Sequence, residues 1–216
     1  PRIKRVRLTY HYPEWTGLDP EVDEESPDIR AVAGTKVTVE IQTDVPLADA
    51  VLVHDERAAP LASEGTISSG TLSIEKPGRY HLAATVAGER VVLSDDYSVE
   101  IVPDEKPVVQ IERPGRDWRA TSIEEVPVRV RAYDDFRLQS VELRYSVNGG
   151  EWRSIPLDRA VKETRRAVLL DLEALGAQEA SEAPLLAPGD LISYYAVAKD
   201  HKRTVETDLF MIQVQP

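Results

Sequence analysis

The chain contains no cysteine, which excludes a disulfide framework, a cysteine-ligated zinc site and thiol catalysis. Its four histidines (His11, His54, His81 and His201) are scattered, and no two of them have a metal-ligand spacing such as His-x-x-x-His. The sequence also lacks a nucleophile elbow, a phosphate-binding loop and a dinucleotide fingerprint. We therefore expect a chain that is not an enzyme, needs no cofactor and holds no tightly bound metal.

Long apolar runs and positive charge are also scarce. No apolar run approaches the roughly 18 residues of a membrane-spanning helix, and no signal peptide is visible. The 26 lysines and arginines are outnumbered by 38 acidic residues, which gives a formal net charge of -12. Because such a chain repels phosphate groups, we expect no nucleic-acid partner and no membrane contact by this fragment. The basic cluster at residues 2–7 alternates with apolar residues, which is typical of a solvated strand face.

Strand patterns fill most of the 216 residues, 42% of which are hydrophobic. Apolar and polar residues alternate with a period of two in segment after segment, which indicates half-buried β-strands. Asn148-Gly149 predicts a tight hairpin, and residues 172–182 favour a short helix. The clearest expected strands span residues 5–12, 36–42, 50–54, 71–75, 79–86, 97–102, 126–132, 140–147, 152–157, 166–172, 191–198 and 207–215.

A break in this pattern divides the chain. Residues 103–107 read Pro-Asp-Glu-Lys-Pro, and a short segment bracketed by prolines predicts a semi-rigid linker. The strand pattern restarts after it, so each half holds about seven short strands with turns every 8–12 residues or so, as in an immunoglobulin-like sandwich. We predict an all-β chain of two tandem Ig-like or FnIII-like β-sandwich domains, residues 1–103 and 104–216.

One stretch of the first half resembles the tyrosine corner of immunoglobulin-type domains. Residues 76–82 read KPGRYHL, where a Gly-x-Tyr pattern opens the penultimate strand. The resemblance implies that the ring of Tyr80 is buried and that its hydroxyl bonds back to the preceding turn. Antibody domains have a cysteine two positions later, where this chain has Leu82. The resemblance thus implies that apolar packing, for instance against Val39 or Ile41, replaces the inter-sheet disulfide.

Further strings resemble modules of large bacterial envelope proteins. In the second half these strings are AYDDFRL at 132–138, VELRY at 141–145 and PGDLISYYAVAKD at 188–200, which resemble fibronectin-III-like modules. The opening YPEWTGL at 12–18, followed by AGT at 33–35, resembles a bacterial family of unknown function. Its members carry N-terminal membrane helices, such modules and a long helical remainder. The resemblance implies membrane anchoring of the whole protein and an extracytoplasmic location in the periplasm or cell envelope.

A long polar segment, residues 13–28, holds six acidic residues between Asp19 and Asp28. It begins like a calcium-binding loop, but Glu24 stands where the glycine of an EF-hand belongs, and Arg30 stands where its final glutamate belongs. An EF-hand is therefore excluded. An irregular Ca²⁺ site and a solvated loop both remain open, and the solvated loop is favoured.

A second carboxylate group consists of Asp134, Asp135 and Asp200. The first two are expected to end the strand at 126–132, and Asp200 to end the strand at 191–198. In a sandwich these strands lie in facing sheets, so the three side chains can meet at one pole and bind a hard cation such as Ca²⁺. The alternative is that each aspartate caps its own turn. Turn capping is favoured over a Ca²⁺ site, so Asp134, Asp135 and Asp200 are candidates for metal binding and no more.

The function indicated is a non-catalytic structural or protein-interaction module of a larger extracytoplasmic bacterial protein. Its partner would be a protein or the other domains of the same chain. Strand patterns begin directly at Pro1 and end directly at Pro216, so we expect the sequence to be a piece of a longer protein. The alternative is a carbohydrate-binding or accessory module of a larger enzyme, which would need an exposed aromatic platform. Only Trp15 stands in a loop long enough to suggest exposure.

Overall fold

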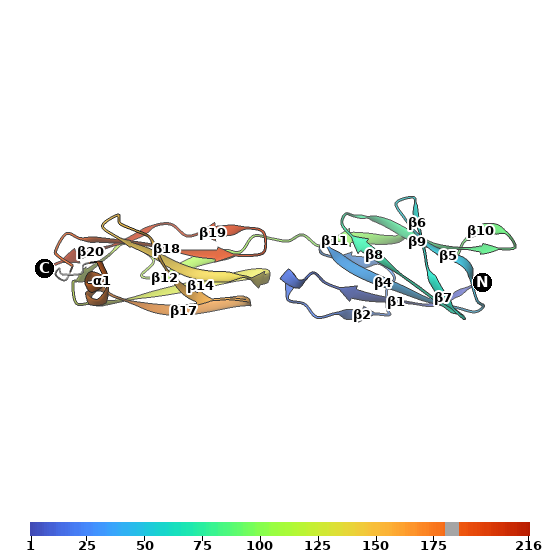
Figure 1. The fold of residues 1–216 in the computed structure, drawn as a ribbon, viewed down its shortest axis with the longest axis horizontal. Helices are drawn as coiled ribbons and strands as arrows, with labels where there is room; N and C mark the ends of the chain where they lie inside the picture. Colours follow the sequence, from blue (N-terminus) through green and yellow to red (C-terminus); the bar gives the residue numbers. More distant parts are fainter. Residues whose placement is uncertain (180–185) are drawn as a thin grey trace. The chain divides into compact units, whose positions relative to one another are not determined.

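The computed structural model describes residues 1–179 and 186–216, and these divide into two compact units, residues 1–104 and 105–216. The division falls one residue from the boundary that the sequence predicts. Each unit is a β-sandwich with its own apolar core (Figure 1). The chain is therefore all-β, with two tandem sandwich domains, as the sequence predicts.

The first domain consists of two facing sheets. In β4 every second residue from Thr35 to Thr43 is buried, and β1 places Leu8 opposite Val39 in the same sheet. The order in the first sheet is β2 (Glu21–Asp23), β1 (Ile3–His11), β4 (Thr35–Thr43), β8 (Ile67–Ile74) and β7 (Ala62–Glu64). The order in the second is β3 (Ile29–Ala31), β11 (Tyr97–Ile101), β9 (Gly78–Val86), β5 (Ala48–His54) and β6 (Arg57–Pro60), with β10 (Glu89–Val92) also on β9.

The second domain has a sheet of three strands facing a sheet of six. Val128 and Val130 of β14 are buried, whereas Arg129 between them is exposed. The order in the smaller sheet is β12 (Val108–Arg113), β14 (Glu125–Leu138) and β17 (Val161–Asp171). The order in the larger is β13 (Trp118–Thr121), β20 (Phe210–Gln215), β18 (Leu191–Lys199), β15 (Ser140–Val147) and β16 (Arg153–Asp158), with β19 (Thr204–Glu206) also on β18.

Both domains share one way of closing the sandwich. The first strand of each domain joins the first sheet, as β1 pairs with β4 and β12 pairs with β14. The chain then crosses to the other sheet, where β3 and β13 run parallel to the last strands, β11 and β20. The segment before the crossing therefore belongs to one sheet and the segment after it to the other, so that the chain links the two sheets at one edge.

Several local expectations need correction. The acidic segment expected to be a loop contains a 3-10 turn, η1 (Glu14–Thr16), and the short strand β2. The strand expected to end at Ala132 continues to Leu138, because its register shifts after Tyr133 and the strand then resumes. Strands β3, β6, β7, β10, β13 and β19 were not expected.

One short α-helix, α1 (Leu172–Glu179), follows β17 in the described part of the second domain (Figure 1). It lies within the helix expected at 172–182, whose last three residues fall outside the described ones. No helix among the described residues combines the length and the apolar character of a membrane span.

Each domain should fold without the other, because each has a complete core. We expect residues 1–104 and 105–216, expressed separately, to give cooperative thermal unfolding and dispersed NMR spectra. A piece that begins at Pro107 should be less stable than one that begins at Glu105, because the Glu105 backbone N–H donates to the Asp135 carboxylate at 2.9 Å. Two separate pieces that both remain unfolded would show that the domains are not independent.

Candidate functional site

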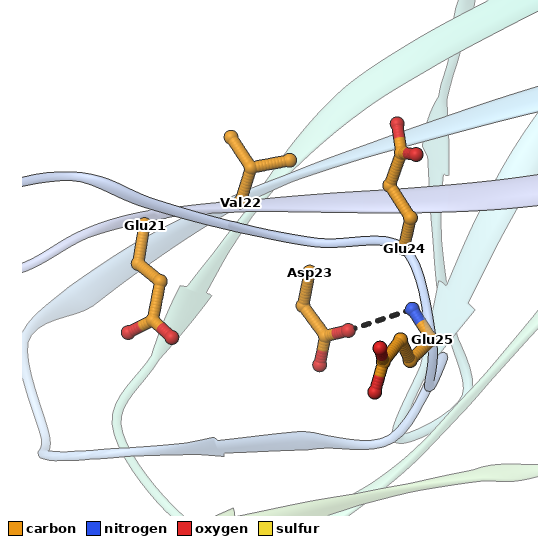
Figure 2. Close-up of a pocket in the computed structure, with 5 residues that line it drawn as sticks. All are labelled: Glu21, Val22, Asp23, Glu24 and Glu25. Atoms are coloured by element: carbon orange, nitrogen blue, oxygen red, sulfur yellow. Dashed lines mark hydrogen bonds between the residues drawn. The ribbon is translucent and has the colours of Figure 1, made fainter.

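A concave acidic surface lies at the edge of the first domain. It is lined by residues 21–25 and encloses about 610 Å³. Figure 2 shows the carboxylates of Glu21, Asp23 and Glu25 on one side of this segment, with Val22 and Glu24 on the other. The alternation follows from the pairing of β2 with β1, in which Glu21 and Asp23 lie opposite Tyr10 and Leu8. We call Glu21, Asp23, Glu24 and Glu25 the acidic β2 surface.

Much of this surface is engaged in local contacts. Glu24 accepts a hydrogen bond from Arg7 Nε at 2.5 Å, and this bond and its charge raise the pKa of Arg7. Glu21 accepts from the hydroxyl of Tyr12 at 2.9 Å. Asp23 Oδ1 accepts from the backbone N–H groups of Glu25 and Ser26, as a turn-capping aspartate does. The hydrogen bonds of Asp23 fit a turn cap, and Arg7 of the basic N-terminal cluster is neutralised in place.

Tyr80 sits where the chain crosses between the two sheets of the first domain. Its ring is fully buried, and burial raises the pKa of its hydroxyl, which remains a donor at neutral pH. The resemblance implied a bond to the preceding turn, but the hydroxyl donates instead to the carbonyl of Pro27, just before β3. Leu82 is fully buried in the same core cluster as Val39 and Ile41.

Tyr80→Phe should destabilise the first domain by about 1–3 kcal/mol, because the Pro27 carbonyl loses its donor in a mostly buried place. Tyr12→Phe is the matched control, since its hydroxyl bonds at the exposed edge and its loss should cost about 0.5 kcal/mol or less. Urea unfolding of the whole chain, followed by signals assigned to the first domain, measures both. Equal effects of the two substitutions would contradict the role given to Tyr80.

The aspartates of the second domain lie in two facing sheets. Asp134 and Asp135 lie in β14, where its register shifts, and Asp200 directly follows β18. Asp134 Oδ2 accepts from the N–H groups of Phe136 and Arg137, at 3.1 and 2.8 Å. Asp200 Oδ1 accepts in the same way from Lys202 and Arg203. Both therefore cap their own turns, but Asp135 does not, since its Oδ2 accepts from Glu105.

Two aromatic side chains are exposed in the part of the chain that the structure describes, Trp152 and Tyr133, whereas Trp15 is half-buried. Trp152 is 46% exposed and packs against Tyr195, with the two ring centroids 5.1 Å apart and an angle of 71° between the ring planes. Because the rings are almost perpendicular, they do not form one flat platform. Arg144 joins this outer face through Glu142 and the Tyr195 hydroxyl. Strand alternation predicts that Glu142 and Arg144 lie on the same face of β15. It does not predict the contact between Trp152 and Tyr195, which depends on how the hairpin places the Trp152 ring.

The remaining candidates are isolated side chains. His81 Nδ1 lies 3.1 Å from Asp96 and points away from the core that Tyr80 and Leu82 enter, as strand alternation predicts. His54 lies 3.5 Å from the neighbouring Asp55. Trp15 is half-buried, and Trp118 packs against the second core beneath Arg116.

Comparisons with known proteins give structural likeness without a family. No protein-family model matches the chain, and no curated protein matches it. Among solved structures it is similar to fibronectin(III)-like modules of Clostridium thermocellum CbhA, with 15% identity over 88% of this chain and 92% of that one, at a TM-score of 0.30. It is also similar to the I9–I11 tandem of titin, with 11% identity over 88% of this chain and 63% of that one, at a TM-score of 0.37.

Proposed function

We propose that the chain is a non-catalytic structural or protein-interaction module of a larger extracytoplasmic bacterial protein, where it spaces or presents other domains. The observation that carries this proposal is the presence of two complete cores in one chain. A spacer must hold its own shape without a ligand, and each sandwich buries its own apolar residues to do so.

The use of the polar side chains supports the same proposal. Asp134 and Asp200 cap turns, Glu24 and Glu40 neutralise Arg7, and Asn148 and Asp190 tie two turns of the second domain together. These contacts stiffen the ends and edges of the sandwiches. The bacterial and extracytoplasmic parts of the proposal are supported by the sequence strings that resemble envelope-protein modules.

An exchange experiment tests the role as a spacer. In the parent protein, residues 1–216 are replaced by an unrelated tandem of two β-sandwiches of similar length, and a second variant deletes the segment. We expect the exchange to retain the parent protein's cellular function and the deletion to lose it, because a spacer contributes length and stiffness rather than a specific surface. Loss of function in both variants would contradict a role as a spacer alone and would indicate that the chain also supplies a specific interaction surface.

The charge of the first domain gives a second test, for the interaction role. If a partner protein binds the acidic β2 surface, neutralising Glu21 and Glu25 to glutamine should weaken its binding at low salt more than at high salt. Trp152→Ala, which alters the outer face of the second domain, is the control. A partner that the Trp152 variant loses and the glutamine variant retains would move the interaction surface to the second domain.

A further inference from the structure

At one end of the second domain, the carboxylates of Asp134 and Asp135 each have one oxygen without a hydrogen-bond partner in the described part of the chain. Asp134 is 5% exposed and Asp200 4% exposed, so both side chains are buried. Oδ1 of Asp134 and Oδ1 of Asp135 are also buried, and neither has a hydrogen-bond partner among the residues that the structure describes. Burying an ionised carboxylate without partners for its oxygens is costly, and proteins ordinarily pair such groups or use them to coordinate metals.

The guanidinium of Arg203 is engaged by Asp200 and by the backbone. Arg203 lies 3.1 Å from Asp200 Oδ2 and also donates to the carbonyl of Glu105 at 2.6 Å. Burial first, and then the charges of Asp135 and Asp200, raise the pKa of Asp134. Burial raises the pKa of Asp200, but hydrogen bonds from the backbone N–H groups of Lys202 and Arg203, together with the charge of Arg203, lower it below its usual value. Asp134 and Asp135 are thus two adjacent acids whose charges repel each other, and the guanidinium of Arg203 is bound to Asp200.

We infer that Asp134 and Asp135, together with Asp200, bind a divalent cation that prefers oxygen ligands, of the Ca²⁺ kind. Oxygen-only side chains favour Ca²⁺ over Zn²⁺, which prefers nitrogen and sulfur ligands. The unpartnered Oδ1 atoms supply the first two ligands, and backbone carbonyls or water complete the six to eight oxygens that Ca²⁺ takes. The three carboxylates do not all lie within 4.8 Å of one another, so binding draws Asp200 and the two β14 aspartates together.

The aspartates of the second domain differ from the acidic β2 surface in whether their carboxylate oxygens have partners. Glu21, Asp23 and Glu24 have hydrogen-bond or ion-pair partners in the first domain. In the second domain the capping bonds use one oxygen of Asp134, and the other is left over. Turn capping therefore accounts for the hydrogen bonds of Asp134 Oδ2. It does not account for a second carboxylate oxygen, Oδ1, that is buried without a hydrogen-bond partner among the described residues.

Calcium titration of the whole chain tests the inference. Unfolding is followed by calorimetry and by NMR signals of each domain, first in the presence of a chelator and then with CaCl₂. The CaCl₂ concentration is raised to roughly ten times a dissociation constant on the order of 1 mM. We expect Ca²⁺ to raise the melting temperature of the second domain by about 4 °C or more and to leave the first domain unchanged. Mg²⁺ should have a smaller effect, because it demands a more rigid octahedral site.

Two substitutions identify the ligands while keeping the turns. Asp134→Asn and Asp135→Asn each retain a side-chain oxygen that can accept from the backbone N–H groups bound by the aspartate, and each removes one negative charge. Each should weaken Ca²⁺ binding, measured by calorimetric titration, at least tenfold. In chelator, Asp134→Asn should be as stable as the wild type or more so. Glu25→Gln, which removes the same charge from the first domain, is the matched control and should bind Ca²⁺ normally.

Three results would overturn the inference. The first is the absence of a Ca²⁺-dependent rise in melting temperature. The second is a rise that both asparagine variants retain, or that Glu25→Gln loses, since it would place the ion elsewhere or reduce it to charge screening. The third is a gain of stability in Asp134→Asn with no Ca²⁺ response in the wild type, which would show that the paired acids share a proton instead.

Discussion

The sandwich of the first domain depends on one crossing of the chain. The polypeptide leaves the first sheet after β2 and enters the second sheet at β3, where Ile29 begins a parallel pairing with β11. The crossing places the Pro27 carbonyl within the domain, and Tyr80 of β9 supplies its hydrogen bond. Asp28 adds a second tie, because its carboxylate accepts from the N–H of Ser98 in β11 at 2.8 Å. These contacts join the crossing segment to strands β9 and β11 of the second sheet.

This crossing also explains where the negative charge lies. Residues 19–28 form the path from one sheet to the other, so they run along the open edge of the sandwich rather than through its core. Acidic side chains are tolerated there because water reaches them, and the edge strand β2 is protected from pairing with other chains by its own charge. The acidic β2 surface is thus a consequence of the topology, and the fold does not require it to bind a partner.

The sequence predicts those parts of the fold in which a local pattern carries the information. The alternation of residues 5–12 and 36–42 predicted β1 and β4, and Asn148-Gly149 predicted the hairpin between β15 and β16, where both residues have positive φ. The short strands β3, β6, β7, β10, β13 and β19 were missed because three or four residues hold too little alternation to recognise. The partner of Tyr80 lies 53 residues away, and no local pattern predicts such a contact.

The candidate site shows the same division between pattern and packing. The sequence could place Asp134, Asp135 and Asp200 at the ends of facing strands, and it favoured turn capping by each of them; Asp134 and Asp200 make such bonds, whereas Asp135 accepts from Glu105. It could not show that β14 continues past these residues to Leu138 with a shift in register. That shift leaves Asp134 inside the domain rather than at an exposed strand end, with one oxygen capping and the other buried. A carboxylate in that position is costly unless a proton or a cation accompanies it, so the irregular strand is what makes this pole chemically distinct from an ordinary turn.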